Sequence, residues 1–197
     1  MNLLRDIILT LTGWLFTQNI ILVNGFGATI SYNYAKQRFK DRVITAVCMS
    51  GFVFAAMIFC YLASVILSAN ESKKYIIPLI YVIIICLMFF ITARVLKHYL
   101  YNIYIKIKGY LAVAVFNSYI FAVLLINESS KYDFVKSIFF ALFSGLAFLV
   151  ASTIMSFGIK VTNSKYIPKA FRGFPAQMIY IGIICLILTA FNGNIVA

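Results

Sequence analysis

Four polar side chains lie inside long apolar runs of the sequence: Asn19, Asn24, Asn117 and Ser118. Each needs a hydrogen-bond partner, because burying an unpaired polar group is costly. Two alternatives account for them equally well. They hold neighbouring helices together, with glycines allowing close packing, or they line a polar site near the midplane of a membrane, built by two interrupted helices that face one another.

The first and fourth apolar runs carry the features that interrupt a helix. Asn24-Gly25-Phe26-Gly27 lies within the first run, and two glycines and an asparagine at that depth weaken a helix enough to break it. Asn117-Ser118 lies near the middle of the fourth run. We therefore predict a broken helix in each run.

The sequence contains none of the motifs of a self-contained enzyme. It has no Ser-His-Asp set, no H-E-x-x-H motif and no Gly-rich phosphate loop. The cysteines lie in apolar runs without C-x-x-C spacing, as small packing residues do. No carboxylate falls inside a predicted span, which argues against a self-contained proton-coupled pump. The four cysteines are Cys48, Cys60, Cys86 and Cys185.

His98 is the single histidine and stands beside Lys97 in a predicted link. A solvated or headgroup-facing role suits it better than metal ligation. Tyrosines surround this link, and an aromatic belt at the membrane interface explains them better than a cofactor-binding motif. They are Tyr99, Tyr101, Tyr104 and Tyr110.

The composition indicates a protein that has the lipid bilayer as its solvent. Of 197 residues, 63% are hydrophobic and 11% are charged, whereas soluble domains carry roughly 25% charged residues. This length holds about six spans of roughly 20 residues, which predicts one all-α membrane domain over residues 1–197. We place the spans at about Ile7–Ile30, Val43–Leu67, Tyr75–Ala93, Gly109–Ile126, Phe134–Gly158 and Phe174–Phe191.

Positive charge alternates between successive links and predicts the topology. Twelve of the 17 lysines and arginines follow the first, third and fifth spans, so these links face the cytoplasm and both termini face outward. The net charge of +12 therefore signals membrane orientation and not nucleic-acid binding. The first run lacks a cleavage site and should be retained as a helix. The twelve residues are Lys36, Arg38, Lys40, Arg42, Arg94, Lys97, Lys106, Lys108, Lys160, Lys165, Lys169 and Arg172.

Six spans divided three and three would have opposite orientations in the membrane. This is the inverted-repeat arrangement, in which broken helices form sites near the midplane. The first and fourth spans, which carry the predicted interruptions, would then occupy equivalent positions in the two halves.

The link before the last span resembles a signature of the Rnf/Nqr membrane subunits. It reads Ile167 to Pro175 and contains Pro168, Phe171, Arg172 and Gly173, and the following span ends in Ala-Phe-Asn-Gly. Two further stretches fit the same family. Asn19 to Val23 with Gly27 and Lys36 resembles its first helix, and Asn117 to Asn127 resembles its fourth. The outward termini resemble the RnfA/NqrE type of subunit, in a bacterial inner membrane.

The resemblance implies a heteromer. In this family an RnfA/NqrE-type subunit pairs with an oppositely inserted RnfE/NqrD-type relative, and each supplies two cysteines to a shared iron–sulfur cluster inside the membrane. Thr29 and Ser118 stand at the two cysteine positions here. Because hydroxyls substitute poorly for thiolates, the resemblance implies a chain that lacks its own cluster.

Two classes of function remain open. The chain is a subunit of an electron-transport, ion-translocating complex, without catalysis of its own, or it is a transporter or channel subunit with a polar midplane pocket. A membrane assembly scaffold is a weaker alternative. In each case we expect the midplane site to be formed by Asn19, Asn24, Gly25, Gly27, Thr29, Asn117 and Ser118.

Overall fold

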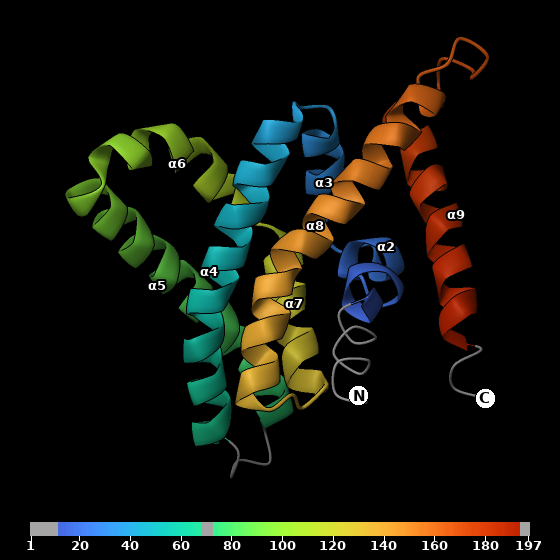
Figure 1. Ribbon diagram of the computed structural model, residues 1–197. Coiled ribbons are helices and arrows are strands. Elements are labelled where there is room, and N and C mark those ends of the chain that lie inside the picture. The colour runs from blue at the N-terminus through green and yellow to red at the C-terminus, as the bar shows by residue number, and fades with distance from the viewer. Residues whose placement is uncertain (1–11, 68–72, 194–197) are drawn as a thin grey trace, which may run out of the picture. The chain divides into compact units, whose positions relative to one another are not determined.

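The structure, a computed structural model, describes residues 12–67 and 73–193 (Figure 1). Helices and their short connections make up these ranges, which contain no strand. The elements are η1 (Gly13–Thr17, a π-helical turn), α2 (Ile20–Asn24), α3 (Ala28–Ala35), α4 (Phe39–Ile66), α5 (Lys73–Tyr99), α6 (Tyr101–Val115), α7 (Ser118–Ser129), α8 (Phe134–Thr162) and α9 (Phe174–Gly193).

The chain forms two compact units. The described residues of 1–43 and 146–197 make up the first unit, and those of 44–145 make up the second. Both boundaries fall inside long helices, so α4 and α8 each contribute residues to both units. The first broken helix belongs to the first unit and the second broken helix to the second.

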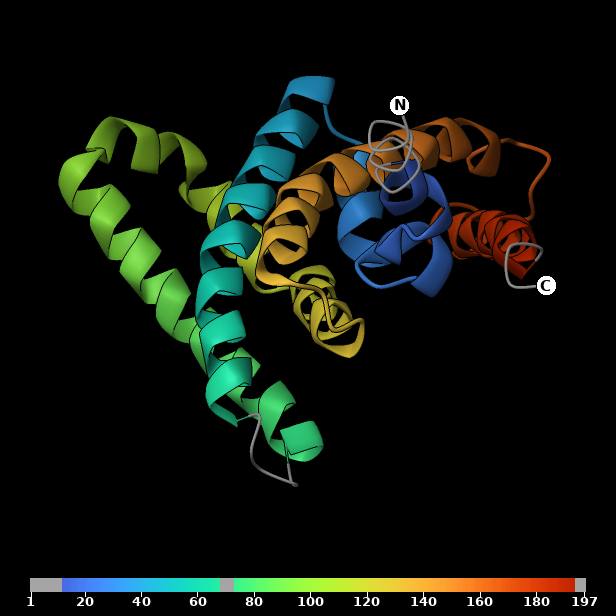
Figure 2. The ribbon, with the colours of Figure 1, turned by 60° about the horizontal axis from the view of Figure 1, so that its bottom comes forward.

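The first unit is held together by contacts of α9 with α2 and α8. In Figure 2 the short helix α2 lies beside α9. Gln177 on α9 is fully buried. It donates to the Met155 carbonyl at 3.0 Å and accepts from the Thr162 hydroxyl at 3.0 Å. A Cβ at Gly158 would lie 2.4 Å from the Tyr180 ring, so any larger residue would force this side chain to move.

In the second unit, the parts of α4 and α8 that belong to this unit pack closely at Gly145. A Cβ at this position would lie 2.5 Å from the Ala46 carbonyl oxygen. The Ser50 hydroxyl donates to the Leu142 carbonyl at 2.9 Å. Small residues at a crossing and a hydroxyl that bonds across it are typical of helix packing in membranes. Helix α6 meets α5 at a corner and then diverges from it, and α7 also contacts α5 (Figure 1).

Three helices are long and apolar enough to cross a membrane on their own, within the described ranges. They are α4, α5 and α8, and each lies where a span was predicted. A fourth candidate is the pair α6 and α7, which bends by 57° at the break. Helix α9 is a shorter apolar helix. The fold is therefore all-α with three or four candidate spans, and the six-span inverted repeat stays a prediction.

Both predicted interruptions occur. The first run divides into η1, α2 and α3, and the fourth divides into α6 and α7. The predicted start of the first span at Ile7 lies outside the described residues. The fourth span was predicted to end at about Ile126, and α7 continues to Ser129 and includes Glu128. Its carboxylate accepts a hydrogen bond from the buried Tyr81 hydroxyl at 3.1 Å, so a carboxylate does reach into the helix packing.

Candidate functional site

Asn19 lies between η1 and α2 in the first broken helix, and both the oxygen and the nitrogen of its side-chain amide make hydrogen bonds. The Oδ1 atom accepts from the backbone N–H groups of Ile21 and Leu22, which caps α2. The Nδ2 group donates to the Leu15 and Ala147 carbonyls at 2.9 Å each. Asn19 is fully buried, and its bonds account for the polar group. Its role here is to hold the break together.

Two glycines with left-handed backbone form the second half of this break. Gly25 has a φ of 74° and ends α2, and Gly27 has a φ of 79° and precedes α3. Few other residues adopt this conformation without strain. The Gly25 N–H donates to the Ile21 carbonyl, and the Ala28 N–H donates to the Gly25 carbonyl. The predicted backbone break at these positions is therefore a sharp, hydrogen-bonded turn.

The other side chains of the first break are exposed. Asn24 and Thr29 are exposed, as is the Phe26 ring between the glycines. Behind them, the Cys185 thiol of α9 donates to the Val23 carbonyl at 2.7 Å. This contact was not predicted, because nothing in the spacing of Cys185 indicates its partner 162 residues earlier.

The second break lies in the second unit and is built on Asn117. Its Oδ1 atom accepts from the Tyr119 and Ile120 N–H groups at 2.8 and 3.1 Å, which caps α7. Its Nδ2 group donates to the Ala114 carbonyl and, at 3.2 Å, to the Val113 carbonyl. These carbonyls belong to the last turn of α6, so one side chain joins both sides of the break.

Ser118 and Phe116 flank Asn117 and are exposed. Next to them, Tyr119 is fully buried and its hydroxyl donates to the Ser144 carbonyl of α8 at 2.6 Å. The structure thus separates two kinds of residue at this break. Asn117 and Tyr119 hold the backbone in place, while Ser118 presents a hydroxyl at the surface.

The structure brings the predicted site residues together in two groups. Asn24, Gly25, Gly27 and Thr29 share the first break with the Asn19 cap, and Asn117 and Ser118 share the second. Each break is capped by an asparagine that uses the same pattern of hydrogen bonds. The sequence analysis missed that the first helix also breaks before Asn19. The signal was present, since asparagine followed by an apolar run is a typical helix start.

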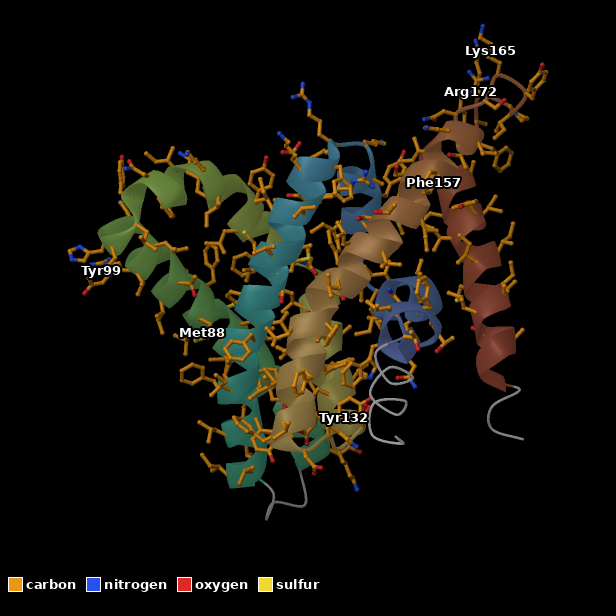
Figure 3. All side chains as sticks on the ribbon, in the orientation of Figure 1. Met88, Tyr99, Tyr132, Phe157, Lys165 and Arg172 are labelled. Carbon is orange, nitrogen blue, oxygen red and sulfur yellow. The ribbon has the colours of Figure 1, made fainter. Side chains whose placement is uncertain are left out.

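The family-like link between α8 and α9 is a folded turn in the first unit. Figure 3 labels Arg172 and Lys165 on it. The Arg172 Nη2 group donates to the Lys165 and Ile167 carbonyls at 3.1 and 3.0 Å. The Pro168 carbonyl accepts from the N–H groups of Phe171 and Arg172. Gly173 has a φ of 89°. Phe171 is exposed, so the motif consists of a rigid turn with an aromatic ring at its surface.

The cysteines do not gather at either break. Cys48 and Cys60 lie on α4, Cys86 on α5 and Cys185 on α9, all with free thiols. Across the part of the chain that the structure describes, no three His, Cys, Asp or Glu side chains are grouped to hold a metal ion. Apart from the Cys185 thiol, the polar side chains at the breaks carry amide and hydroxyl groups, which can hydrogen-bond but do not ligate soft metals well.

Comparison with known proteins shows the family. The model of the family described as "Rnf-Nqr subunit, membrane protein" matches residues 7–195. A curated relative from Acetobacterium woodii, the RnfA-type component of its Na(+)-translocating ferredoxin:NAD(+) oxidoreductase complex, is 25% identical over 183 residues. That alignment covers 91% of this chain and 93% of the relative. The resemblance in the sequence is thereby confirmed, and the chain belongs to the Rnf-Nqr family of membrane subunits.

Proposed function

We propose that this chain is an RnfA/NqrE-like subunit of a bacterial membrane complex that couples electron transfer to ion translocation. The observation that carries this proposal is the match to the Acetobacterium woodii relative over almost the whole of both chains. Near-complete coverage in both directions supports an equivalent place in a complex, because the chain has the length and the helices that such a place needs. The described helices supply three or four candidate spans for it.

We further propose that the two breaks form the midplane polar site, facing one another in an inverted repeat. The matching asparagine caps support this, since Asn19 and Asn117 each accept from the N–H groups two and three residues later and donate to the carbonyl four residues earlier. Two equivalent breaks are what an internal repeat would produce. Asn24, Thr29 and Ser118 then provide the polar side chains of the site.

The residues at these breaks do not fit an iron–sulfur cluster. Thr29 and Ser118 occupy the positions that resemble the family's cysteines, and both present hydroxyls at the surface of the chain. Iron–sulfur clusters are held by thiolates. The thiol that contacts the first break, Cys185, is engaged with the Val23 carbonyl. We therefore propose that this chain provides no cluster ligands of its own, and that its part in the complex is structural or pathway-forming.

The surface at each break supports a heteromer. Phe26 and Phe116 are 47% and 54% exposed beside the polar residues. A partner that covers these rings would bury apolar area and enclose the hydroxyls. We propose that the partner is an oppositely oriented RnfE/NqrD-like relative, and that both termini of this chain lie outside the inner membrane.

Affinity purification of the tagged chain from its native membrane tests the assembly. We expect a homologous membrane protein of opposite orientation and further components of the complex to co-purify. Replacing Arg172 with Ala should not prevent this unless the α8–α9 link itself forms part of the interface. Recovery of the chain alone, fully functional as a monomer, would contradict the proposed heteromer.

Iron and acid-labile sulfide analysis tests the absence of cluster ligands. The chain purified alone should contain neither, whereas the double variant Thr29→Cys with Ser118→Cys, purified with its partner, should gain iron and sulfide. The matched control is Ser129→Cys, at the far end of α7 from Ser118, which should gain none. Stoichiometric iron and sulfide in the unaltered chain by itself would refute the cluster-free assignment.

A further inference from the structure

An open pocket of about 450 Å³ lies at the end of α5, in the second unit, and basic side chains line it. Arg94, Lys97 and His98 line it. They are spaced i, i+3 and i+4, so they project from one face of the helix. The proposed electron-transfer role makes no use of these residues, and a headgroup-facing position was all that the sequence predicted for His98.

The charge of this pocket is not balanced within its own helices. No acidic residue occurs between Glu71 and Glu128 in the sequence, so neither α5 nor α6 contains a carboxylate of its own. Cations in the last turn of a helix do complement its dipole. That effect accounts for single charges and does not explain why Arg94, Lys97 and His98 line one pocket.

An exposed apolar stripe leads directly to the pocket. Leu87, Phe90 and Ile91 are 56%, 67% and 54% exposed on α5. They precede Arg94 by seven, four and three residues, so they share its face of the helix. The distance from Leu87 to His98 along the axis is about 16 Å, at 1.5 Å per residue. An apolar track that ends in cations suits a molecule with hydrocarbon chains and an anionic head.

Exposed aromatic residues next to the pocket indicate that it lies at the level of the lipid headgroups. The chain bends at Leu100, where α5 gives way to α6, and Figure 3 labels Tyr99 at this corner. Tyr99 and Tyr101 are 75% and 57% exposed, as expected at the level of lipid headgroups. The Tyr99 ring meets the His98 imidazole edge to face, with centroids 4.8 Å apart, and so restricts the orientation of the imidazole.

We propose that this pocket binds the phosphate group of an anionic phospholipid, with the acyl chains lying along Leu87, Phe90 and Ile91. Arg94 and Lys97 supply charge and N–H donors to the phosphate oxygens, and His98 supplies a further donor. Basic pockets at the ends of membrane helices are suited to such headgroups. The apolar stripe and the exposed tyrosines favour a lipid phosphate over a free phosphate ion.

Native mass spectrometry of the full chain in detergent tests the proposal, with phosphatidylglycerol and phosphatidylcholine added in equal amounts. The unaltered chain should retain phosphatidylglycerol selectively. Lys97→Gln or Arg94→Gln should each weaken retention about fivefold, the effect of one cation near an anionic headgroup. Lys97→Arg, which keeps the charge, should retain it. The matched control is Lys106→Gln, an exposed cation of α6 that does not line the pocket.

Each other outcome overturns the assignment. Equal retention by the Lys97→Gln variant and the unaltered chain would show that the pocket is not the binding site. An equal loss in the Lys106→Gln control would reduce the effect to general charge attraction. Inorganic phosphate that displaces the lipid, at an ionic strength where chloride does not, would assign the pocket to free phosphate. Circular dichroism of every variant separates these results from loss of fold.

Discussion

Both breaks interrupt an apolar helix, but different residues produce the two interruptions. The first uses two interruptions, one before Asn19 and one at Gly25 and Gly27, and leaves α2 only five residues long. The second uses a single interruption at Asn117 without any glycine. Asn19 is fully buried and bonds to α8, whereas Asn117 is half-buried and bonds only to its own segment. The first break thus depends on the rest of its unit, and the second is locally self-sufficient.

The largest expected effect comes from removing the two asparagines in turn. Asn19→Ala removes the α2 cap and the buried hydrogen bond from Asn19 to the Ala147 carbonyl of α8, which should lower the free energy of unfolding by about 2–3 kcal/mol. Asn117→Ala removes a cap at a partly exposed break and should cost about 1 kcal/mol. Denaturant titration of each variant in detergent, followed by circular dichroism, measures the difference.

Asn19→Ser is the control for this comparison. It retains an oxygen that can cap α2 without burying a charge, but it lacks the Nδ2 group that donates to both carbonyls, so its loss of stability should fall below that of Asn19→Ala if the cap contributes. Equal losses for Asn19→Ala and Asn117→Ala would show that the bond to α8 adds nothing, and that the two breaks are equally local.

The next effect distinguishes a glycine break from a break without glycine. Gly25→Ala should cost about 1–2 kcal/mol of unfolding free energy, the penalty for a left-handed backbone with a Cβ. No atom lies within 4 Å of the added Cβ, so sterics from neighbours contribute nothing. Gly109→Ala, in the middle of α6 with equally open surroundings, is the matched control. It should be neutral or gain up to about 1 kcal/mol from helix propensity.

A Gly25→Ala variant as stable as Gly109→Ala would mean that the α2 end does not need its left-handed turn. The first break would then resemble the second, where the helix bends by 57° without a positive φ. Thermal unfolding of the two variants side by side is sufficient to decide this.

The sequence allowed the long helices to be predicted well, because α4, α5 and α8 are long apolar runs bounded by charge. Glycine and asparagine also indicated where the first and fourth runs break. The cap at Asn19 was missed because a lone asparagine in an apolar run reads equally as interhelical glue. Its deciding partner, Ala147, lies 128 residues away.

Charge counting likewise assigned Arg42 to a link but could not predict its environment. It is 8% exposed, with a guanidinium that donates to the Ser152 carbonyl of α8. The same limit applies to Glu128, which the sequence placed beyond a span and which the structure bonds to Tyr81. Local composition determines the runs and their ends, whereas side-chain partners far along the chain are determined only by packing.

The smallest effect concerns the carbonyls next to each break. At the second break, Asn117 itself donates to Val113 and Ala114. At the first, the Cys185 thiol donates to the Val23 carbonyl near the end of α2. Because a thiol is a weak donor, Cys185→Ala should lower the unfolding free energy by only about 0.5 kcal/mol.

Cys185→Ser, which restores a donor, should recover this stability, and Cys86→Ala on α5 is the matched control. If Cys185→Ser were no more stable than Cys185→Ala, packing and not the hydrogen bond would account for the thiol at this position.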